Sequence, residues 1–421
     1  MRILLATYQD KTIFQTMVPL AWALRTAGHE VRVACQPSFA DVVTQAGLTA
    51  APVGRNHTTW RIAEMHPENE EADRAGLPAP YDAAVTAPAA LDWQAMQDGY
   101  RHLIAHWHKL DNFPMVADLV DFARHWRPDL VIWEATTYAG AIAAKACGAA
   151  HARLLWSIDV FGATRERFLR LKAEQPPENR ADPLADWLSG YARKYGFDFG
   201  EDLVTGQFSI DQLPASLSMR ADLDYLPMRY VPYGGPAVVP KWLWTPPQRP
   251  RVALTLGTTA TDRFAGYTVD VQDILDALAD LDIELVATIA ENQRHKAPRV
   301  PDNTRVVSYV PLHALTPTCA AVINHAGPGT FLTTALHGVP QLTVPWEFDA
   351  PELARRAAGQ GATLMLLGDR ATGQAVRESV LRLLNEPAFR ERAHDLRDEI
   401  HAQPTPNQLA PQLEKRAAEH R

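Results

Sequence analysis

The 421-residue sequence has few cysteines and lacks long apolar runs. Its three cysteines, Cys35, Cys147 and Cys319, lie far apart and are odd in number. That spacing argues against a disulfide framework, and we expect Cys35 and Cys147 to pack as small apolar side chains. No apolar run reaches the roughly 18 residues of a membrane-spanning helix, and the strand-like start, Met1–Ala6, is too short for a signal peptide core. The sequence therefore predicts a cytoplasmic protein with no membrane partner.

Positive charge is also scarce. There are 41 lysines and arginines against 49 aspartates and glutamates, which gives a formal net charge of −8, and no basic run occurs. This balance argues against nucleic acid as a partner. Hydrophobic residues make up 47% and charged residues 21%, as in an ordinary globular protein. Because 421 residues would make an unusually large single core, two domains are expected.

Two glycine-rich nucleotide motifs are missing. The turn after the first predicted strand, Tyr8–Thr12, contains no glycine, whereas a dehydrogenase binds the pyrophosphate of its cofactor through glycines there. The P-loop pattern Gly-x-x-x-x-Gly-Lys-Ser/Thr does not occur either. His102 and His106 have the spacing of zinc ligands, but the glutamate of a metalloprotease motif is absent between them. No resident cofactor and no metal site are expected.

Apolar strands and amphipathic helices alternate along the chain. This rhythm predicts an α/β fold of doubly wound, Rossmann-like domains with parallel sheets. In the first half the predicted strands cover residues 3–7, 31–35 and 129–133, and the predicted helices cover 17–26, 39–46 and 137–147. Residues 55–100 interrupt the rhythm, as either a lid over a substrate or a plain surface excursion.

Prolines divide the chain. Eight of them lie between Leu213 and Pro250, a density that marks an irregular connector. A second α/β pattern starts with the apolar run 251–257. The predicted organisation is a first domain over 1–215, a linker over 216–245, a second domain over 246–400, and a tail helix over 401–421.

The segment 322–330, Val-Ile-Asn-His-Ala-Gly-Pro-Gly-Thr, is the most informative one in the chain. It predicts a strand, a loop of small residues and a helix that opens at Thr330. Gly327 and Gly329, on either side of Pro328, let the backbone approach a ligand, and the helix start offers free N–H groups to an anion. His325 can donate a further hydrogen bond to a phosphate oxygen. An ordinary strand–helix turn is the alternative reading of these residues alone.

The next predicted strand, 341–345, ends in Trp346-Glu347-Phe348-Asp349. In an open α/β sheet, ligands bind beyond the carboxyl ends of the strands, so this corner and the loop at 325–330 can face one pocket. The loop offers groups for phosphate, and Glu347 and Asp349 offer carboxylates for sugar hydroxyls. Together they predict a nucleotide-sugar site.

These residues carry a family resemblance. The donor region resembles that of family 1 glycosyltransferases, which have the GT-B fold of two domains facing a cleft, through His325-x-Gly327-x-Gly329-Thr330, the run Gly338-Val339-Pro340-Gln341 and the Asp349 corner. More narrowly, the chain resembles actinomycete antibiotic glycosyltransferases, which add deoxysugars to natural products, through Val18–Leu24, Gly28–Val31 and Arg229–Gly235.

The resemblance implies roles for further residues. Gly257, Thr258 and Thr259 are expected near the donor phosphates, and the backbone of Val310 and Leu312 near the nucleotide base. Asp349 is followed by Ala350, where many hexose-using relatives have glutamine, so the donor is expected to be a thymidine diphosphate (TDP) sugar lacking hydroxyls. In relatives the tail helix often crosses back to the first domain.

The acceptor side departs from the family pattern. In relatives a histidine lies six residues before the proline of Val-Pro-Leu and serves as the base, but this chain has Ile13 at that position, followed by Phe14. Asp10, on the same loop, and Glu134, in a position that resembles that of the base of some carbon-linking members, are the candidate replacements. Glu134 could also be an acid stabilised by a helix N-terminus. Ile13, Phe14, Trp133 and Trp156 are the expected acceptor contacts.

The sequence thus predicts an inverting, metal-independent transferase that moves a deoxysugar from a TDP-sugar to an aglycone. Because no histidine base is present, we favour an acceptor that is already acidic or nucleophilic. An aromatic aglycone linked through oxygen, carbon or nitrogen meets that requirement. The alternatives are a macrolide O-glycosyltransferase that needs an auxiliary protein, a hexose-nucleotide 2-epimerase, and a catalytically impaired binding relative. The resemblance also allows a homodimer and a cytochrome-P450-like helper that lacks haem function.

Overall fold

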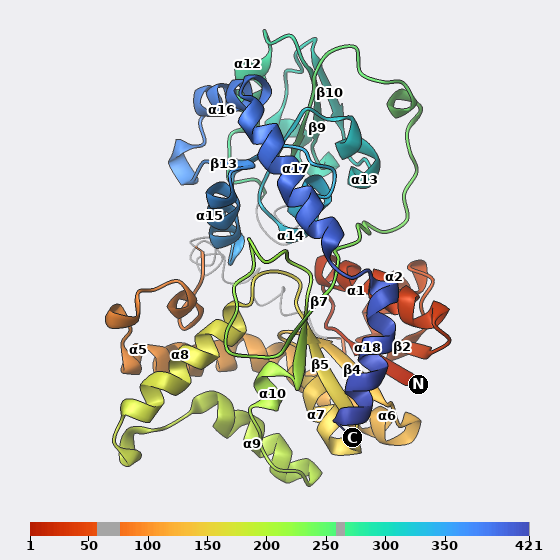
Figure 1. Ribbon diagram of the computed structural model, residues 1–421, viewed down its shortest axis with the longest axis vertical. Coiled ribbons are helices and arrows are strands. Elements are labelled where there is room, and N and C mark those ends of the chain that lie inside the picture. The colour runs from red at the N-terminus through yellow and green to blue at the C-terminus, as the bar shows by residue number, and fades with distance from the viewer. Residues whose placement is uncertain (57–75, 258–265, 421) are drawn as a thin grey trace.

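The computed structural model describes residues 1–56, 76–257 and 266–420 of the chain. It contains two α/β domains, one below the other in Figure 1, and each is built on its own parallel sheet. The predicted fold class is therefore confirmed. Thr258 and Thr259 lie outside the described residues.

The sheet of the first domain has seven strands in the order β3-β2-β1-β4-β5-β6-β7. Neighbouring strands are parallel, with Ile3 of β1 opposite Val31 of β2 and Leu130 of β4. Side chains alternate between two buried cores, with Leu4 in one core and Ile3 and Leu5 in the other, because helices cover both faces of the sheet. The strands are β1 (Arg2–Ala6), β2 (Glu30–Cys35), β3 (Ala50–Pro52), β4 (Leu130–Glu134), β5 (Ala150–Leu154), β6 (Phe208–Asp211) and β7 (Tyr225–Pro227).

The helices of the first domain begin where the sequence supplies caps. The Asp10 side chain caps α1 by accepting from the backbone N–H groups of Thr12 and Ile13, so α1 begins at Lys11 and not near Met17 as predicted. The helices are α1 (Lys11–Thr26), α2 (Ala40–Gln45), α5 (Trp93–Leu103), α6 (Lys109–Trp126), α7 (Tyr138–Cys147), α8 (Val160–Glu174), α9 (Pro183–Tyr195) and α10 (Asp202–Thr205). A π-helical turn, Ile104–His108, joins α5 to α6.

The second domain has a six-stranded parallel sheet in the order β10-β9-β8-β11-β12-β13. Its strands are β8 (Arg251–Thr255), β9 (Glu284–Thr288), β10 (Thr304–Val307), β11 (Ala321–Asn324), β12 (Gln341–Thr343) and β13 (Thr363–Met365). Its helices are α12 (Val271–Leu278), α13 (Leu312–Leu315), α14 (Pro328–Ala335), α15 (Ala350–Gln360), α16 (Gly373–Asn385) and α17 (Pro387–Ala402). In both sheets the order runs outward in two directions from the first strand, which is the doubly wound arrangement.

The connector is more ordered than its proline content indicated. Residues 216–245, predicted as an irregular linker, include β7, which forms the edge of the first sheet. Farther along, the Tyr230 hydroxyl donates to the carbonyl of Gly329 at 3.0 Å, and it lies 3.1 Å from the Thr333 hydroxyl. The backbone N–H of Arg229 donates to the carbonyl of Pro404. The connector therefore contacts both α14 and the turn that follows α17.

The last helix, α18 (Pro406–Glu419), lies against the first domain (Figure 1). Its apolar face, which includes Leu409 and Leu413, belongs to the same core as Val18 and Leu24 of α1. Arg416 forms an ion pair with Asp224 at 2.8 Å. The chain thus begins and ends in the same domain.

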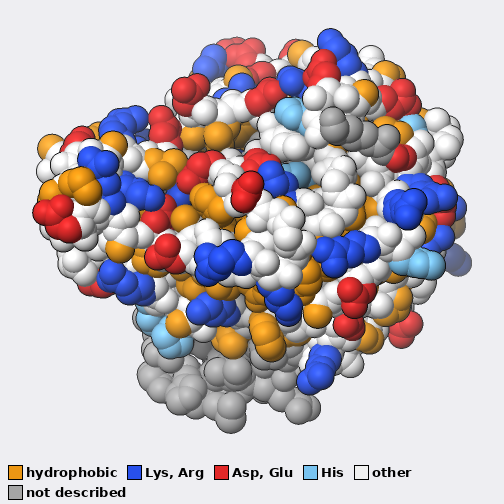
Figure 2. Space-filling model, turned by 90° about the horizontal axis from the view of Figure 1, so that it is seen from below, with side chains coloured by type: hydrophobic (Ala, Val, Ile, Leu, Met, Phe, Trp, Pro, Cys, Tyr) orange, Lys and Arg blue, Asp and Glu red, His pale blue; other side chains and the backbone are white. Residues whose placement is uncertain are grey.

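The two domains share a hydrophobic core between them. Leu213, Leu217 and Tyr230 from the first domain and the connector pack with Phe331 and Leu396 of the second. Figure 2, which views the molecule from below, shows acidic and basic side chains interspersed on that face. None of the helices in the described ranges is both long and apolar enough to cross a membrane.

Candidate functional site

The carboxyl ends of the two sheets bring the predicted site residues together. In the first sheet β1, β4 and β5 are neighbours, so the loops that begin at Tyr8, at Ala135 and at Leu155 lie side by side. In the second sheet β8, β11 and β12 are neighbours, so the loops that begin at Leu256 and His325 lie beside the corner at Trp346. Contacts between the two groups of loops place the candidate site at the junction of the domains.

The donor loop is held by a buried amide network. The Asn324 side chain donates to Gln341 Oε1 at 2.8 Å and accepts from the backbone N–H of Ala326 at the same distance. Ala326 has a φ of 61°, a left-handed conformation that side chains rarely adopt, so this network sets the direction of the loop. Helix α14 then begins at Pro328, two residues before the predicted start at Thr330.

The start of α14 presents unsatisfied N–H groups. No side chain caps this helix, and its first residue is proline, so the N–H groups of Gly329 and Thr330 have no partner within the helix. The helix dipole adds partial positive charge at the same place. Gly327, Gly329 and Thr330 are each partly exposed, so an anion can reach them. This geometry fits the predicted diphosphate site.

The ring of His325 is clamped between two glycines. A Cβ added at Gly257 would lie 2.4 Å from His325 Cε1, and one added at Gly327 would lie 2.2 Å from Nε2, so neither glycine can be replaced without moving the ring. Burial lowers the pKa of His325 to about 4, although a hydrogen bond with the backbone of Thr255 acts in the opposite direction. Nδ1 is buried and has no hydrogen-bond partner in the described part of the chain. The donor loop therefore holds a neutral, positioned imidazole whose Nδ1 has no partner among the described residues.

The residues predicted to hold the nucleotide base lie close by. Val310 is buried in a small core with Val322 of β11 and Leu315 of α13, and Leu312, the first residue of α13, packs against that core. Helix α13 packs on α14. The backbone at 310–312 is therefore next to the helix that carries the phosphate site.

The corner after β12 reaches into the first domain. Phe348 has a φ of 45°, and its ring lies against Tyr81, Trp107, Trp156 and Phe161, with centroid distances of 5.7–6.1 Å. These four rings belong to the first domain, so their packing compensates for the strained backbone. Glu347 is partly exposed beside this aromatic cluster.

Asp349 is enclosed in the same place. Its side chain is only 4% exposed, and burial raises its pKa to about 7, although the nearby Ser157 hydroxyl favours the charged form. No hydrogen bond joins the two side chains, however, because Ser157 Oγ and Asp349 Oδ2 both lack partners in the described ranges. The predicted sugar-binding carboxylate thus faces a loop of the first domain.

Glu134, predicted just beyond its strand, is the last residue of β4. Its carboxylate accepts from the backbone N–H and the hydroxyl of Thr136 at 3.0 Å. Complete burial raises its pKa from 4.5 to about 7, and the nearby Thr137 hydroxyl and the hydrogen bonds from Thr136 only partly oppose that rise. The negative charge of Asp111 raises it further. A carboxyl with a pKa near neutrality can take up a proton under physiological conditions.

Asp10, the other candidate base, has a structural task. Its Oδ1 accepts from the N–H and the hydroxyl of Thr12, both at 2.8 Å, and from the N–H of Ile13 at 3.1 Å. These three bonds commit Oδ1 to capping the start of α1. The geometry therefore favours Glu134 over Asp10.

Two of the four expected acceptor contacts are core residues. Phe14 is 1% exposed and packs edge-to-face on Phe39, while Trp133 is fully buried and its indole N–H donates to His151. These two predictions do not fit the structure, because both side chains point into the packed cores beside the sheet. Ile13 is also buried, at 7% exposure, in the core that holds Trp133, whereas Trp156 is partly exposed in the aromatic cluster.

Sequence reasoning missed four residues at this junction: Tyr81, Trp107, Phe161 and Ser157. Tyr81 comes from residues 76–100, a described part of the segment that interrupts the strand–helix rhythm, and Trp107 comes from the π-helical turn that follows α5. The available signal was the adjacency of Trp156 and Ser157 directly after a predicted strand. Tyr81 is further fixed by a 2.7 Å hydrogen bond between its hydroxyl and the buried His108.

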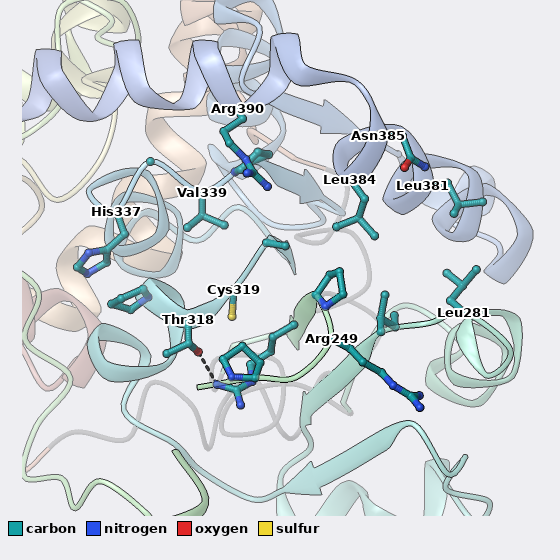
Figure 3. A pocket seen from close by; sticks show the side chains of 18 of the residues that line it. Arg249, Leu281, Thr318, Cys319, His337, Val339, Leu381, Leu384, Asn385 and Arg390 are labelled. Atoms are coloured by element: carbon teal, nitrogen blue, oxygen red, sulfur yellow. Dashed lines mark hydrogen bonds between the residues drawn. The ribbon is translucent and has the colours of Figure 1, made fainter. Parts of the chain in front are cut away.

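A separate cavity of about 740 Å³ lies at the opposite ends of the strands of the second sheet from the donor loop (Figure 3). Its lining includes Arg249, Thr318, Val339 and Arg390. The first three of these precede β8, β11 and β12, so the cavity lies at the amino ends of those strands. It is distinct from the donor loop, and ligands of open α/β sheets bind at the opposite ends.

Two family profiles together match most of the chain. Residues 22–257 match "Erythromycin biosynthesis protein CIII-like, N-terminal domain", and residues 272–416 match the corresponding C-terminal domain. The first profile ends just after β8, and the second begins at the start of α12.

Characterised relatives align over their whole length. The chain is 48% identical to 10-deoxymethynolide desosaminyltransferase from Streptomyces venezuelae, over all of this chain and 98% of the relative. It is 42% identical to aclacinomycin-T 2-deoxy-L-fucose transferase from Streptomyces galilaeus, over all of this chain and 97% of the relative. Among solved structures, glycosyltransferase VinC in complex with DTDP superposes with a TM-score of 0.88 at 38% identity and full coverage of both chains.

Proposed function

This chain belongs to the erythromycin biosynthesis protein CIII-like family of antibiotic deoxysugar glycosyltransferases, and on that premise we propose that it transfers a deoxysugar from a TDP-sugar to a natural-product aglycone with inversion at the anomeric carbon. The observation that carries the proposal is the donor loop, where His325, Gly327 and the open start of α14 form an anion site. In the proposed reaction the acceptor atom attacks the anomeric carbon as the bond to diphosphate breaks.

The first charge problem is the departing diphosphate. As the glycosidic bond breaks, negative charge develops on the leaving oxygen, and fixed donors aimed at that charge stabilise the transition state. Here the donors are the N–H groups of Gly329 and Thr330 and the imidazole of His325. Among the described residues no cluster of three or more histidine, cysteine or carboxylate side chains is arranged to hold a metal ion. We propose that departure is metal-independent.

The second charge problem is the proton that the acceptor loses. We assign it to Glu134, since its pKa of about 7 lets it be ionised and still accept a proton at neutral pH. The Glu134 carboxylate is fully buried, so acceptor binding must open this region before transfer. Catalytic contacts commonly tighten only in the complex with substrate.

The proposed acceptor is a flat aromatic aglycone, linked through oxygen, carbon or nitrogen. The aromatic cluster around Phe348 and Trp156 supports this choice, because aromatic faces pack well on planar ligands. A macrolide alcohol is the second candidate, and the relative at 48% identity, which acts on 10-deoxymethynolide, favours it. A helper protein is required only if the purified chain is inactive with donor and aglycone alone.

The nucleotide part of the donor can be tested by binding. We expect thymidine diphosphate to bind more tightly than deoxyuridine diphosphate, which differs from it only by the ring methyl, and more tightly than uridine diphosphate, in a calorimetric titration of the purified chain. A methyl group that is buried against apolar residues contributes about 0.8 kcal/mol, so the expected preference is about fourfold. Adenosine diphosphate serves as the control for phosphate contacts alone. A clear preference for uridine diphosphate would refute the assignment of the base.

A further inference from the structure

A buried amide lies near the start of α6. Asn112 is only 1% exposed, and an amide buried inside a helix is costly unless its hydrogen bonds are made. Here they are made. Nδ2 donates to the carbonyl of His108 at 2.8 Å and to that of Thr136 at 2.9 Å. Oδ1 accepts from the N–H of Ala139 at 2.8 Å. Asn112 therefore ties α6 to the loop between β4 and α7.

That loop holds the carboxylate of Glu134. The backbone N–H and the hydroxyl of Thr136 each donate to Glu134 at 3.0 Å, while the carbonyl of the same Thr136 accepts from Asn112. The donors to Glu134 are therefore placed by Asn112. If the amide were removed, the Thr136 carbonyl would lose this partner, and the loop could turn together with the carboxylate that it holds.

His108, which accepts from Asn112 through its carbonyl, is the last residue of the π-helical turn before α6. Such turns occur frequently at functional sites. Its ring is fully buried, and burial lowers its pKa to about 3, so the ring is neutral. Nε2 lies 2.7 Å from the Tyr81 hydroxyl, and Nδ1 has no partner among the described residues. Within those residues the orientation of the ring therefore depends on Tyr81 for its hydrogen bond.

Tyr81 is held in turn by the second domain. Its ring packs edge-to-face on Phe161 at 4.9 Å and on Phe348, in the corner after β12, at 6.0 Å. A continuous series of contacts therefore runs from this corner to the carboxylate of the first domain. Its members are each at most 1% exposed, so water does not compete for their hydrogen bonds: Tyr81, His108, Asn112, Thr136 and Glu134.

We propose that Tyr81, His108 and Asn112 form a positioning network, which holds Glu134 in the orientation that takes the proton from the acceptor. The three residues act through Thr136 and do not touch the reacting atoms. Their effect on the rate is expected because a misplacement of about 1 Å in a catalytic group can lower the rate about 10²-fold. This inference rests on the proposed function, since it takes Glu134 as the base.

The experiment is a double-mutant cycle. Tyr81→Phe removes the hydroxyl that is bonded to His108 but keeps the ring, and Asn112→Ala removes the amide. Each substitution is made in the wild-type chain and in Glu134→Gln. Glycoside formation at saturating acceptor gives kcat and the KM of the donor, and thermal unfolding reports the stability of each variant.

Ser209→Ala is the matched control. It also removes a buried, hydrogen-bonded side-chain group of the first domain, but its hydroxyl accepts from Arg153 and lies outside the positioning network. A loss of activity that came only from a less stable first domain would appear in this variant as well. We expect Ser209→Ala to keep the kcat of its parent in both backgrounds.

We expect Tyr81→Phe to lower kcat about 3–10-fold, as for one ordinary hydrogen bond, and Asn112→Ala about 10–100-fold, because it leaves buried groups unpaired. The donor KM should change by less than about twofold, since the donor loop is untouched. In Glu134→Gln each loss of kcat should shrink to less than about twofold, because residues that act through the base have no effect once the base is gone.

Equal losses of kcat in the two backgrounds would overturn the inference, because the network would then support the fold and not the base. Wild-type kcat in Tyr81→Phe would overturn it too, and this variant decides alone if Asn112→Ala does not fold. Wild-type kcat in Glu134→Gln would refute the assignment of the base and the inference with it. Absence of any glycoside from the wild-type chain would instead refute the proposed function.

Discussion

Replacing Glu134 by glutamine is expected to lower kcat by about 10²–10⁴-fold, the range for loss of a positioned general base. Glutamine has nearly the same shape and can still bond to Thr136, but it cannot accept the acceptor's proton. In wild type only the ionised carboxylate is active, so kcat/KM should fall about tenfold per pH unit below the pKa of about 7 and level off above it. Steady-state rates between about pH 5 and 9 measure both effects.

The same substitution should stabilise the fold at high pH. Folding raises the pKa of Glu134 from 4.5 to about 7. At low pH the carboxyl is protonated in both the folded and the unfolded chain, so it does not affect the pH dependence of stability. As pH rises from 4.5 to about 7, only the unfolded chain loses the proton, and the free energy of unfolding falls. Above about pH 7 this decrease is on the order of 3 kcal/mol. Glu134→Gln should therefore be as stable as wild type at low pH and more stable than wild type at about pH 8, by thermal unfolding.

Asp111→Asn is the companion variant. Since the Asp111 charge raises the pKa of Glu134, its removal should shift the acid limb of the rate profile to lower pH without abolishing activity. If Glu134→Gln keeps wild-type kcat, the base is elsewhere and this assignment is wrong. If it loses activity and also unfolds at all pH values, the loss is structural.

Replacing His325 by alanine is expected to lower kcat by about 10²–10³-fold, as does loss of one donor to a developing oxyanion. The His325 ring is neutral at pH 7, because burial lowers its pKa to about 4. A bound diphosphate raises that pKa, so binding takes up a proton, and affinity for thymidine diphosphate should fall as pH rises from about 7 to 9, where the phosphate is fully ionised. Calorimetry in two buffers measures the proton uptake, which His325→Ala should lose.

Gly257→Ala tests the position of the ring without removing it. The new Cβ would overlap His325 Cε1, and φ at Gly257 is +76°, so the ring must move. We expect this variant to reproduce most of the loss seen in His325→Ala. Gly359→Ala is the matched control, since a Cβ there meets nothing within 4 Å. Wild-type turnover in His325→Ala would remove this ring from the site.

The donor loop could be predicted from sequence because phosphate binding uses the backbone. Close approach of a ligand requires Gly327 and Gly329, and the free N–H groups require a helix start, so the requirement appears as a continuous local pattern. The parallel sheets were predictable for a related reason, since buried strand segments such as 130–133 are uniformly apolar. Both features depend on neighbours in the sequence.

The acceptor side was less predictable because it depends on contacts between distant segments. The start of α1 was placed too late, since the capping role of Asp10 was not recognised, and the direction of Phe14 follows from that start. Trp133 lies on a strand buried on both faces, where periodicity does not identify a ligand-facing side. Ser157 and Phe161 became site candidates only when the fold placed Phe348 of the other domain against their loop.

The most direct test of the central claim is a product analysis with the purified chain. A thymidine diphosphate deoxyhexose is incubated with aromatic and macrolide aglycones, and the products are identified by mass spectrometry and by the anomeric coupling in the NMR spectrum. The account predicts a glycoside of inverted anomeric configuration, formed together with one equivalent of thymidine diphosphate, at a rate unchanged by a metal chelator. Release of an isomerised sugar without any glycoside, or a glycoside of retained configuration, would contradict it.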